Sequence, residues 1–153
     1  MQVEDAKLQD AAEILALQKL AYQTEAALYP GARISPVEQG LESLQAEFAD
    51  KIVLKVVHQG RIIGSVRGKV QGDAGLVERF IVHPDFRRQG IGSLLLAALE
   101  ARFAPAPYAR LFTGSRSVSN LQMYAKRGYV ETRREKMDEQ LTFVWMEKKL
   151  SSR

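Results

Sequence analysis

The chain has 153 residues, which is enough for one well-cored domain and too few for two ordinary ones. Its hydrophobic fraction of 46% and charged fraction of 26% lie near the averages of globular proteins, while the absence of cysteine excludes a disulfide scaffold, a thiolate metal site and a cysteine nucleophile. The formal net charge of +4 suits a polyanionic ligand. We therefore expect residues 1–153 to form a single domain.

Helical spacing dominates the first part of the chain after a short strand. Residues 2–8 alternate weakly between apolar and polar and predict that strand. Asp10 suits the N-cap of the helix that follows. Residues 22–34, which contain Tyr-Pro-Gly, predict a loop after this helix. The buried face of the helix would carry Ile14, Leu15, Leu17 and Leu20.

A second helix is predicted to open at Ser35. Pro36 suits the first helical position, and Glu38 stands where a capping box needs an acidic residue. Its buried face would carry Leu41, Leu44 and Phe48.

Strand patterns follow from residue 51. The runs I-V-L-K-V-V-H and R-I-I-G-S-V-R-G-K-V flank the dipeptide Gln59-Gly60, which predicts a β-hairpin. A second turn over residues 71–75 leads into a third strand over residues 76–82.

The third strand passes through a Pro-containing turn into a helix. The junction reads R-R-Q-G-I-G at residues 87–92. Glycines at a helix start let the backbone approach a ligand, and the free N–H groups and dipole of the first turn favour an anion. We therefore expect a phosphate here, although the same residues also suit a tight strand-to-helix connection. The apolar side of the helix would carry Ile91, Leu94, Leu95 and Ala98.

Two other phosphate-binding loops do not fit this junction. The Rossmann fingerprint needs a small residue where Leu95 stands, and the Walker A loop needs a G-K-[ST] string that does not occur. Both are therefore disfavoured.

The last third of the chain holds a strand, a short helix and a hairpin. Two prolines block continuation of the preceding helix, and residues 109–113 predict the strand. The short helix would run over residues 120–127, with Asn120 suited to its N-cap and Gly128 to the left-handed position after its end.

Residues 129–134 and 141–148 predict the closing hairpin. The complete order is β-α-α-β-β-β-α-β-α-β-β, which indicates a mixed α/β (α+β) protein with an antiparallel meander followed by strand-helix-strand units. This order alone does not identify a fold family.

Three motifs together carry a resemblance to a known family. The junction contains R-x-x-G-x-G, with Arg87, Gly90 and Gly92 in the defining places. The strand before it ends V-H-P-D-F-R, and residues 119–129 read S-N-L-Q-M-Y-A-K-R-G-Y. In this order the motifs resemble those of the GNAT superfamily, the acyl-CoA-dependent N-acyltransferases, and the resemblance covers nearly the whole chain.

The resemblance implies both a fold and an activity. The fold would be a single central, mixed and mostly antiparallel sheet flanked by helices. The activity would be transfer of an acetyl or other small acyl group from acetyl-CoA to a primary amine, by direct attack in a ternary complex through a tetrahedral intermediate.

The resemblance also implies cofactor-binding residues. The backbone of Phe80, Ile81 and Val82 would face the pantetheine arm, whose amides resemble peptide groups. Asn120 would contact the cofactor as well. The loop N–H groups that bind the pyrophosphate would belong to Arg87, Arg88, Gln89, Gly90, Ile91, Gly92 and Ser93.

Glu78 is a candidate general base. Strand alternation would place it on the face that Phe80 and Val82 share. An alkylammonium of pKa about 10.4 must lose its proton before it attacks near pH 7, a gap of roughly three pK units or about 4 kcal/mol. The alternative is a strand carboxylate in a salt bridge.

Tyr124 is the candidate general acid. On its own, a Tyr at the end of a short helix would be interpreted as a packed ring with a hydrogen-bonded tip. The resemblance implies instead that it protonates the departing thiolate, since a phenol of pKa about 10 keeps its proton at neutral pH.

The acceptor would be a small-molecule or peptide amine, and nothing in the sequence names it. Contacts to it would come from residues 22–34 and the closing hairpin, where Tyr22, Glu25, Tyr29 and Glu139 are available. The alternative function is a non-catalytic, acetyl-CoA-binding sensory or regulatory domain. A homodimer is compatible with either function.

Several partners are disfavoured. Basic residues are dispersed without a run of five, which argues against nucleic acid. His58 and His83 have no carboxylate or histidine at ligand spacing, so we expect no metal. The N-terminus lacks a signal-peptide pattern, and no apolar window approaches about twenty residues, so we expect a cytoplasmic protein that does not enter the membrane.

Overall fold

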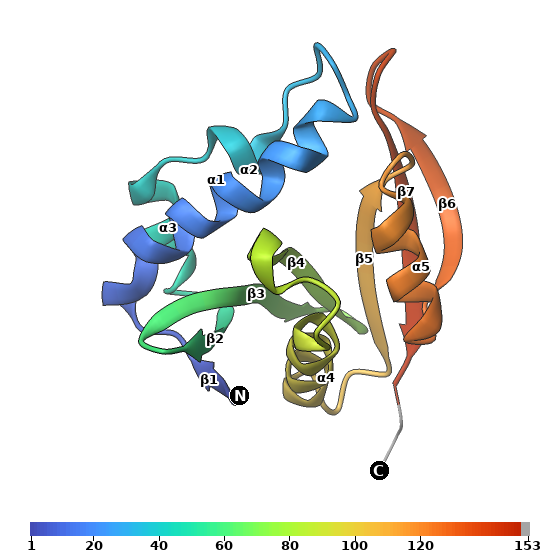
Figure 1. Cartoon of the computed structure of the whole chain (residues 1–153). Coiled ribbons are helices and arrows are strands. Elements are labelled where there is room, and N and C mark those ends of the chain that lie inside the picture. Colours follow the sequence, from blue (N-terminus) through green and yellow to red (C-terminus); the bar gives the residue numbers. More distant parts are fainter. Residues whose placement is uncertain (151–153) are drawn as a thin grey trace.

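The computed structural model describes residues 1–150, in which seven strands form one sheet (Figure 1). The strand order is β1-β2-β3-β4-β5-β7-β6, and every neighbouring pair is antiparallel except β4 with β5. This confirms the expected mixed, mostly antiparallel sheet. The strands are β1 (Val3–Asp5), β2 (Ile52–His58), β3 (Arg61–Gln71), β4 (Ala74–Val82), β5 (Tyr108–Gly114), β6 (Val130–Lys136) and β7 (Thr142–Lys149).

Helices cover both faces of the sheet. One face packs against α1 and α3, and the other packs against α4 and α5, each through its own apolar cluster (Figure 1). No helix within residues 1–150 is long and apolar enough to cross a membrane. The helices are α1 (Ala11–Ala27), α2 (Ser35–Glu38), α3 (Leu41–Glu47), α4 (Ile91–Arg102) and α5 (Val118–Lys126), with single 3₁₀ turns at Leu8–Asp10 and Pro84–Phe86.

The predicted order is confirmed, and the first two predicted helices differ from the prediction in their extent. The first helix continues to Ala27, because residues 22–27 are compatible with a helix and the Tyr-Pro-Gly turn comes only after them. The second predicted helix is divided into α2 and α3, since Gln39 adopts an extended ψ of 136°. Ser35 is the first residue of α2 and makes no side-chain cap.

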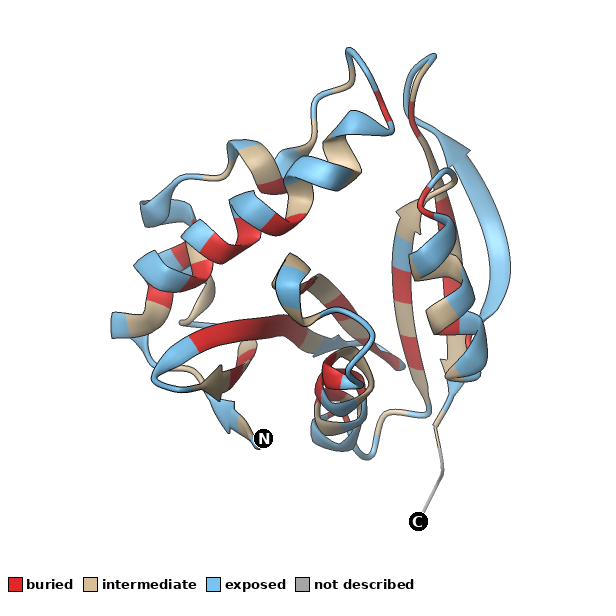
Figure 2. Cartoon of the chain, in the orientation of Figure 1, coloured by how far each residue is buried: buried red, intermediate tan, exposed pale blue. Residues whose placement is uncertain are grey.

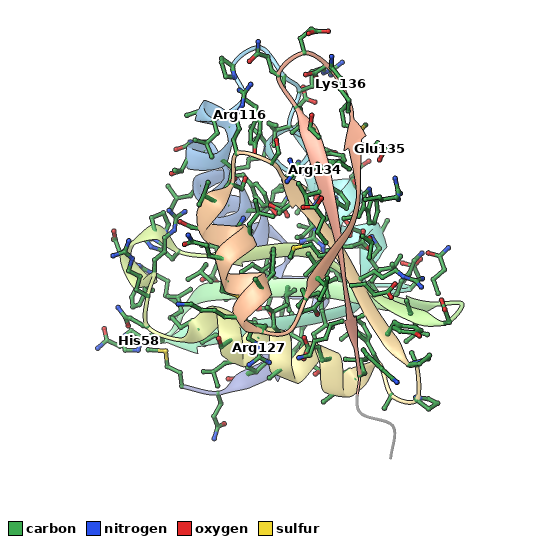
Figure 3. The ribbon with its side chains drawn as sticks, turned by 90° about the vertical axis from the view of Figure 1, so that its right-hand side faces the viewer. His58, Arg116, Arg127, Arg134, Glu135 and Lys136 are labelled. Atoms are coloured by element: carbon green, nitrogen blue, oxygen red, sulfur yellow. The ribbon has the colours of Figure 1, made fainter. Side chains whose placement is uncertain are left out.

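Both predicted hairpins are confirmed. Gln59 and Gly60 have φ values of 51° and 75°, the left-handed pair that a two-residue turn between twisted strands requires. β6 pairs with β7 along its length and forms the edge of the sheet. All seven β6 residues are exposed (Figure 2), and charged side chains, including Arg134, Glu135 and Lys136 (Figure 3), make this edge a poor template for further strand pairing.

The rotation of α4 differs from the prediction. Ile91 and Leu95 are buried as expected, but Leu94 is 45% exposed and Leu96 is fully buried. The helix is apolar on most sides, so periodicity alone does not fix which side faces the sheet. Tertiary contact decides it, because the helix packs closely against strand glycines such as Gly64.

The first helix likewise buries only part of its predicted face. Ile14 and Leu17 are buried, whereas Leu20 is 40% exposed. In α3, Leu44 is buried while Leu41 is 39% exposed. These helices lie on the sheet surface and cover it with one narrow stripe each.

A polar cluster joins these helices to the sheet. Arg67 of β3 is fully buried and donates to Gln18 of α1 and to Glu47 of α3, both at 3.0 Å. Lys51 also reaches Glu47, at 2.9 Å, and Gln39 donates to the same carboxylate. Burial alone would raise the pKa of Glu47, but these hydrogen bonds and charges lower it to about 2.

Candidate active site

A cleft opens where two neighbouring strands diverge. β4 and β5 pair only over Ala74–Leu76 and Tyr108–Arg110, at the start of each strand. Past these pairs a cavity of about 600 Å³ lies between the two strands, and the end of α1, the segment 31–36, the start of α5 and the β6–β7 turn complete its walls. Within residues 1–150, the β4 edge that faces the cleft has no further strand partner. Its backbone N–H and C=O groups are therefore free for a ligand with amide groups.

A β-bulge in β4 shapes this edge. Arg67 of β3 pairs with Glu78 and Ser65 pairs with Ile81, so that Val66 alone stands opposite both Arg79 and Phe80. Arg79 has a φ of 50°, in the left-handed region that a non-glycine residue seldom adopts.

The bulge corrects the predicted position of Glu78. An extra residue inverts the alternation of side chains, so Glu78 shares a face with Arg67, on the side of α1 and α3. Phe80 and Val82 pack instead against the cluster on the α4 side, while Ile81 is buried on the α1 side. The expectation that Glu78 shares a face with Phe80 and Val82 is wrong.

Glu78 nevertheless lines the cavity, at the point where the strands separate. Its side chain is 32% exposed, and its Oε2 atom accepts a hydrogen bond from Lys51 at 3.2 Å. The salt bridge expected in the structural interpretation is therefore present. The Oε1 atom lies outside this pair.

Tyr124 reaches the same cavity from α5. Its ring is buried and lies edge-on to Phe80 and Tyr129, with centroid distances of 5.9 and 6.0 Å. None of the side-chain hydrogen bonds within residues 1–150 involves its hydroxyl, which leaves this group available inside the cavity. Burial raises the pKa of Tyr124, and the nearby Tyr22 and Glu25 raise it further, so the phenol keeps its proton.

The α4 junction has the features of an anion site. Residues 87–90 are exposed, and Arg88 and Gly90 adopt φ values of 63° and 81°. The first helical backbone bond runs from Leu94 to Gly90, at 3.1 Å, so the preceding N–H groups, up to that of Ser93, are not used by the helix. These donors and the guanidinium groups of Arg87 and Arg88 fit a diphosphate.

Gly92 serves a packing role that the sequence did not reveal. A Cβ atom at this position would lie 2.7 Å from Cζ of Phe80. Because Phe80 in turn contacts Tyr124, this glycine joins the start of α4 to the wall of the cavity.

Asn120 is not the N-cap that the sequence predicted. The helix begins at Val118, and Ser117 precedes it, so Asn120 is its third residue. Asn120 lines the cavity. Gly128 has a φ of 99° after the end of this helix, as predicted.

The residues expected to contact the acceptor are partly brought together. Tyr22, Glu25 and Tyr29 all line the cavity. From the hairpin, Asp138 lines it, whereas Glu139 pairs with Lys136 at 3.3 Å. Nothing in the local sequence distinguishes these two adjacent acidic residues of the turn.

A hydrogen-bond network closes one end of the cavity. Ser117 bonds to the Glu25 carboxylate and, at 2.7 Å, to the hydroxyl of Tyr29. Arg116, which lies near the tip of the β6–β7 hairpin (Figure 3), donates to the Leu28 carbonyl at 2.8 Å. These contacts connect the end of α1 to the start of α5, and no sequence motif predicts them.

Comparison with known proteins supports the fold and the family. Residues 21–150 match a family model described as an acetyltransferase (GNAT) domain. The S-(2-succino)cysteine N-acetyltransferase of Bacillus subtilis is 27% identical to this chain, and the alignment covers 92% of this chain and 91% of that protein.

Two solved structures are similar along almost the whole chain. The PaiA N-acetyltransferase of Thermoplasma acidophilum, in complex with coenzyme A, superposes with a TM-score of 0.80 at 18% identity and covers 97% of this chain and 98% of that one. Smu.2055 of Streptococcus mutans has a TM-score of 0.84 at 13% identity, with 99% and 100% covered. At these identities the structures show the fold, and the family model over residues 21–150 shows the membership. The chain belongs to the GNAT family of acetyltransferases.

Proposed function

We propose that this chain transfers an acetyl group from acetyl-CoA to a primary amine bound in the cavity between β4 and β5. The observation that carries the proposal is that Glu78 and Tyr124 line the same cavity, beside the edge of β4 that has no further strand partner within residues 1–150. Phe80, which also lines the cavity, is in close contact with Gly92 at the start of α4. A base, an acid and a cofactor cradle would then meet at one place.

Acetyl-CoA, when bound, would supply the activated acyl group as a thioester. The N–H groups of residues 87–93 would hold its diphosphate, and the free edge of β4 at Phe80, Ile81 and Val82 would hold the amides of its arm. Asn120, at the cavity wall, would add a side-chain contact.

Glu78 is proposed to accept the proton that the amine must lose, directly or through water. Lys51 donates a hydrogen bond to Oε2, so Oε1, which lies outside this pair, would accept the proton. Tyr124 is proposed to donate its phenolic hydrogen to the departing sulfur, since its hydroxyl is protonated and unpaired within residues 1–150.

Amino acids and their derivatives are the first acceptors to test. The Bacillus subtilis relative is named for N-acetylation of a cysteine derivative, S-(2-succino)cysteine. The sequence identity of 27% supports the class of reaction and leaves the identity of the acceptor open.

Two measurements test the proposal together. Acetyl-CoA at a hundred times its Kd should stabilise the folded protein by about 2.7 kcal/mol, and a panel of amines should release free thiol from it. Stabilisation without thiol release from any amine would instead favour a non-catalytic, acetyl-CoA-binding domain. No stabilisation at millimolar acetyl-CoA would contradict both functions.

A further inference from the structure

Arg79 is the cation of the cavity lining that has no hydrogen-bond or ion-pair partner within residues 1–150. This residue occupies the bulge of β4 and lines the cavity. Its Nε atom is buried, and it has no hydrogen-bond partner within residues 1–150. Its guanidinium also takes part in none of the ion pairs in this part of the chain.

The other charged side chains that line the cavity are all partnered. Two of the four pairs join residues that are close in sequence, and two join distant segments. The pairs are Glu78 with Lys51 (3.2 Å), Glu25 with Ser117, Asp138 with the amides of Gln140 and Leu141 (2.7 and 2.8 Å), and Arg33 with Glu38 (3.1 Å). Arg79 is therefore the exception among them.

The guanidinium of Arg79 lies near the side of the cleft that α1 covers. Burial raises the pKa of the Tyr22 phenol, and the positive charge of Arg79 opposes this rise, which places the two groups near each other. Burial lowers the pKa of Arg67, and the positive charge of Arg79 lowers it further. Within residues 1–150, Arg67 is compensated by Glu47 at 3.0 Å, whereas Arg79 has no carboxylate partner.

An unpaired, buried guanidinium nitrogen destabilises the folded protein, because it has lost its hydrogen bonds to water and gained none within residues 1–150. The bulge adds backbone strain at the same residue, since its φ is 50°. Such costs concentrate at binding sites, where a ligand repays them. The group that would pair with the Arg79 guanidinium where it lines the cavity is a planar anion that accepts two parallel hydrogen bonds.

We propose that the acceptor is an amine that also carries a carboxylate, such as an amino acid, and that Arg79 binds this carboxylate. One uncompensated guanidinium balances one negative charge, which fits a carboxylate better than a phosphate dianion. Glu78, the preceding residue, would then face the amine while Arg79 holds the acid group, so the bulge orients the acceptor. This inference rests on the proposed function and narrows it to one substrate class.

The test uses pairs of amines that differ only in the carboxylate. L-Phenylalanine with phenethylamine, L-methionine with 3-(methylthio)propylamine, and L-leucine with 3-methylbutylamine form such a panel. Thiol release gives kcat/KM for each, with the wild type, Arg79→Gln and Arg79→Lys. Arg33→Gln is the matched control, because Arg33 lies at the same cavity and is paired with Glu38.

We expect the wild type to prefer the α-carboxylated member of a pair by at least tenfold. Arg79→Gln should reduce this ratio to within threefold while KM for acetyl-CoA stays unchanged. Arg79→Lys should give a ratio between those of the wild type and Arg79→Gln, since an ammonium group keeps the charge but lacks the two parallel N–H donors of a guanidinium. Arg33→Gln should keep the wild-type ratio. An equal loss for both members in Arg79→Gln, or a wild type that prefers the decarboxylated amines, would overturn the inference.

Binding separates this inference from the proposed function. Calorimetry with coenzyme A present measures the affinity for each amine without turnover. Carboxylated amines that bind the wild type and not Arg79→Gln would support the carboxylate site even if no thiol is released, which would count against catalysis alone. Equal binding by the wild type and Arg79→Gln, or no binding of any carboxylated amine, would overturn the carboxylate site.

Discussion

At the residue scale, Tyr124 offers the sharpest test of the proposed chemistry. Tyr124→Phe keeps the ring that packs against Phe80 and removes only the hydroxyl. Because that hydroxyl has no hydrogen-bond partner within residues 1–150, its loss leaves no donor or acceptor unsatisfied, and the fold and acetyl-CoA affinity should be retained. The turnover rate should fall at least tenfold, in line with typical general-acid contributions of about a hundredfold or more.

Steady-state kinetics with one accepted amine and a titration with acetyl-CoA measure these two quantities. The same assay on Tyr129→Phe gives a comparison, since that hydroxyl donates to Glu100 at 2.8 Å and does not line the cavity. Turnover of Tyr124→Phe within a factor of two of wild type would assign Tyr124 to packing alone.

Glu78 leads to a prediction that depends on pH. Glu78→Gln keeps the shape and can still accept a hydrogen bond from Lys51, but it cannot take a proton from the amine. The rate should therefore fall mainly at lower pH, where more of the amine is protonated, and should approach the wild-type rate as the pH nears the amine pKa of about 10.4. Glu135→Gln, on the exposed edge strand, is the control. A pH–rate profile that coincides with that of the wild type excludes Glu78 as the base.

At the scale of elements, the junction between β4 and α4 depends on close contact. A valine at Gly92 would meet the Phe80 ring, since even a Cβ atom would lie 2.7 Å from it. Displacement of Phe80 would disturb both the cavity wall and the first turn of the helix, so Gly92→Val should weaken acetyl-CoA binding by tenfold or more. The reason is steric and lies within the protein, rather than in space that the phosphate would occupy.

Gly90→Ala provides the comparison for this prediction. A Cβ atom at Gly90 meets nothing within 4 Å, but φ is 81°, so the substitution should cost about 1 kcal/mol of stability through backbone strain alone. Calorimetric affinity and thermal unfolding distinguish the two effects. Acetyl-CoA affinity in Gly92→Val that matches the wild type would show that the contact with Phe80 does not support the cofactor site.

The same elements show what the sequence could and could not predict. Local signals were sufficient for the hairpin at Gln59-Gly60 and for the left-handed Gly128, because the chemistry of a turn lies in its own residues. The bulge at Arg79 has no such signal, and it inverted the predicted face of Glu78. The exposed Leu94 was misplaced for a related reason, since only contact with the sheet fixes the rotation of an apolar helix.

At the scale of the whole molecule, the order of helices and strands along the chain was predictable, whereas the order of strands in the sheet and the cleft were not. The order followed from alternating patterns of short segments, each of which could be read alone. The cavity arises because β4 and β5 pair over three residues and then separate, a property of the complete sheet. Motif positions such as Arg87 and Tyr124 could therefore be named in advance, whereas Arg79 and Ser117 became visible only when distant segments were brought together.

The buried polar cluster around Glu47 connects the layer of α1 and α3 to the sheet. This cluster predicts how the stability of the protein depends on pH. The pKa of Glu47 is about 2 in the folded protein and 4.5 in an exposed chain. A carboxyl group whose pKa is lowered by folding stabilises the folded protein at pH values above its pKa in the unfolded chain. This contribution is lost as the pH falls from about 4.5 toward 2.

Glu47→Gln should therefore destabilise the protein near neutral pH, by on the order of 3 kcal/mol, because Arg67 would lose its carboxylate partner. The difference in unfolding free energy between wild type and variant should shrink steadily between pH 4.5 and pH 2. Urea unfolding at a series of pH values measures it, with Glu42→Gln on the exposed side of α3 as the control. A difference that stays constant over this range would mean that Glu47 is not held ionised by its neighbours, and that the helical layer is held to the sheet chiefly by apolar packing around Leu44.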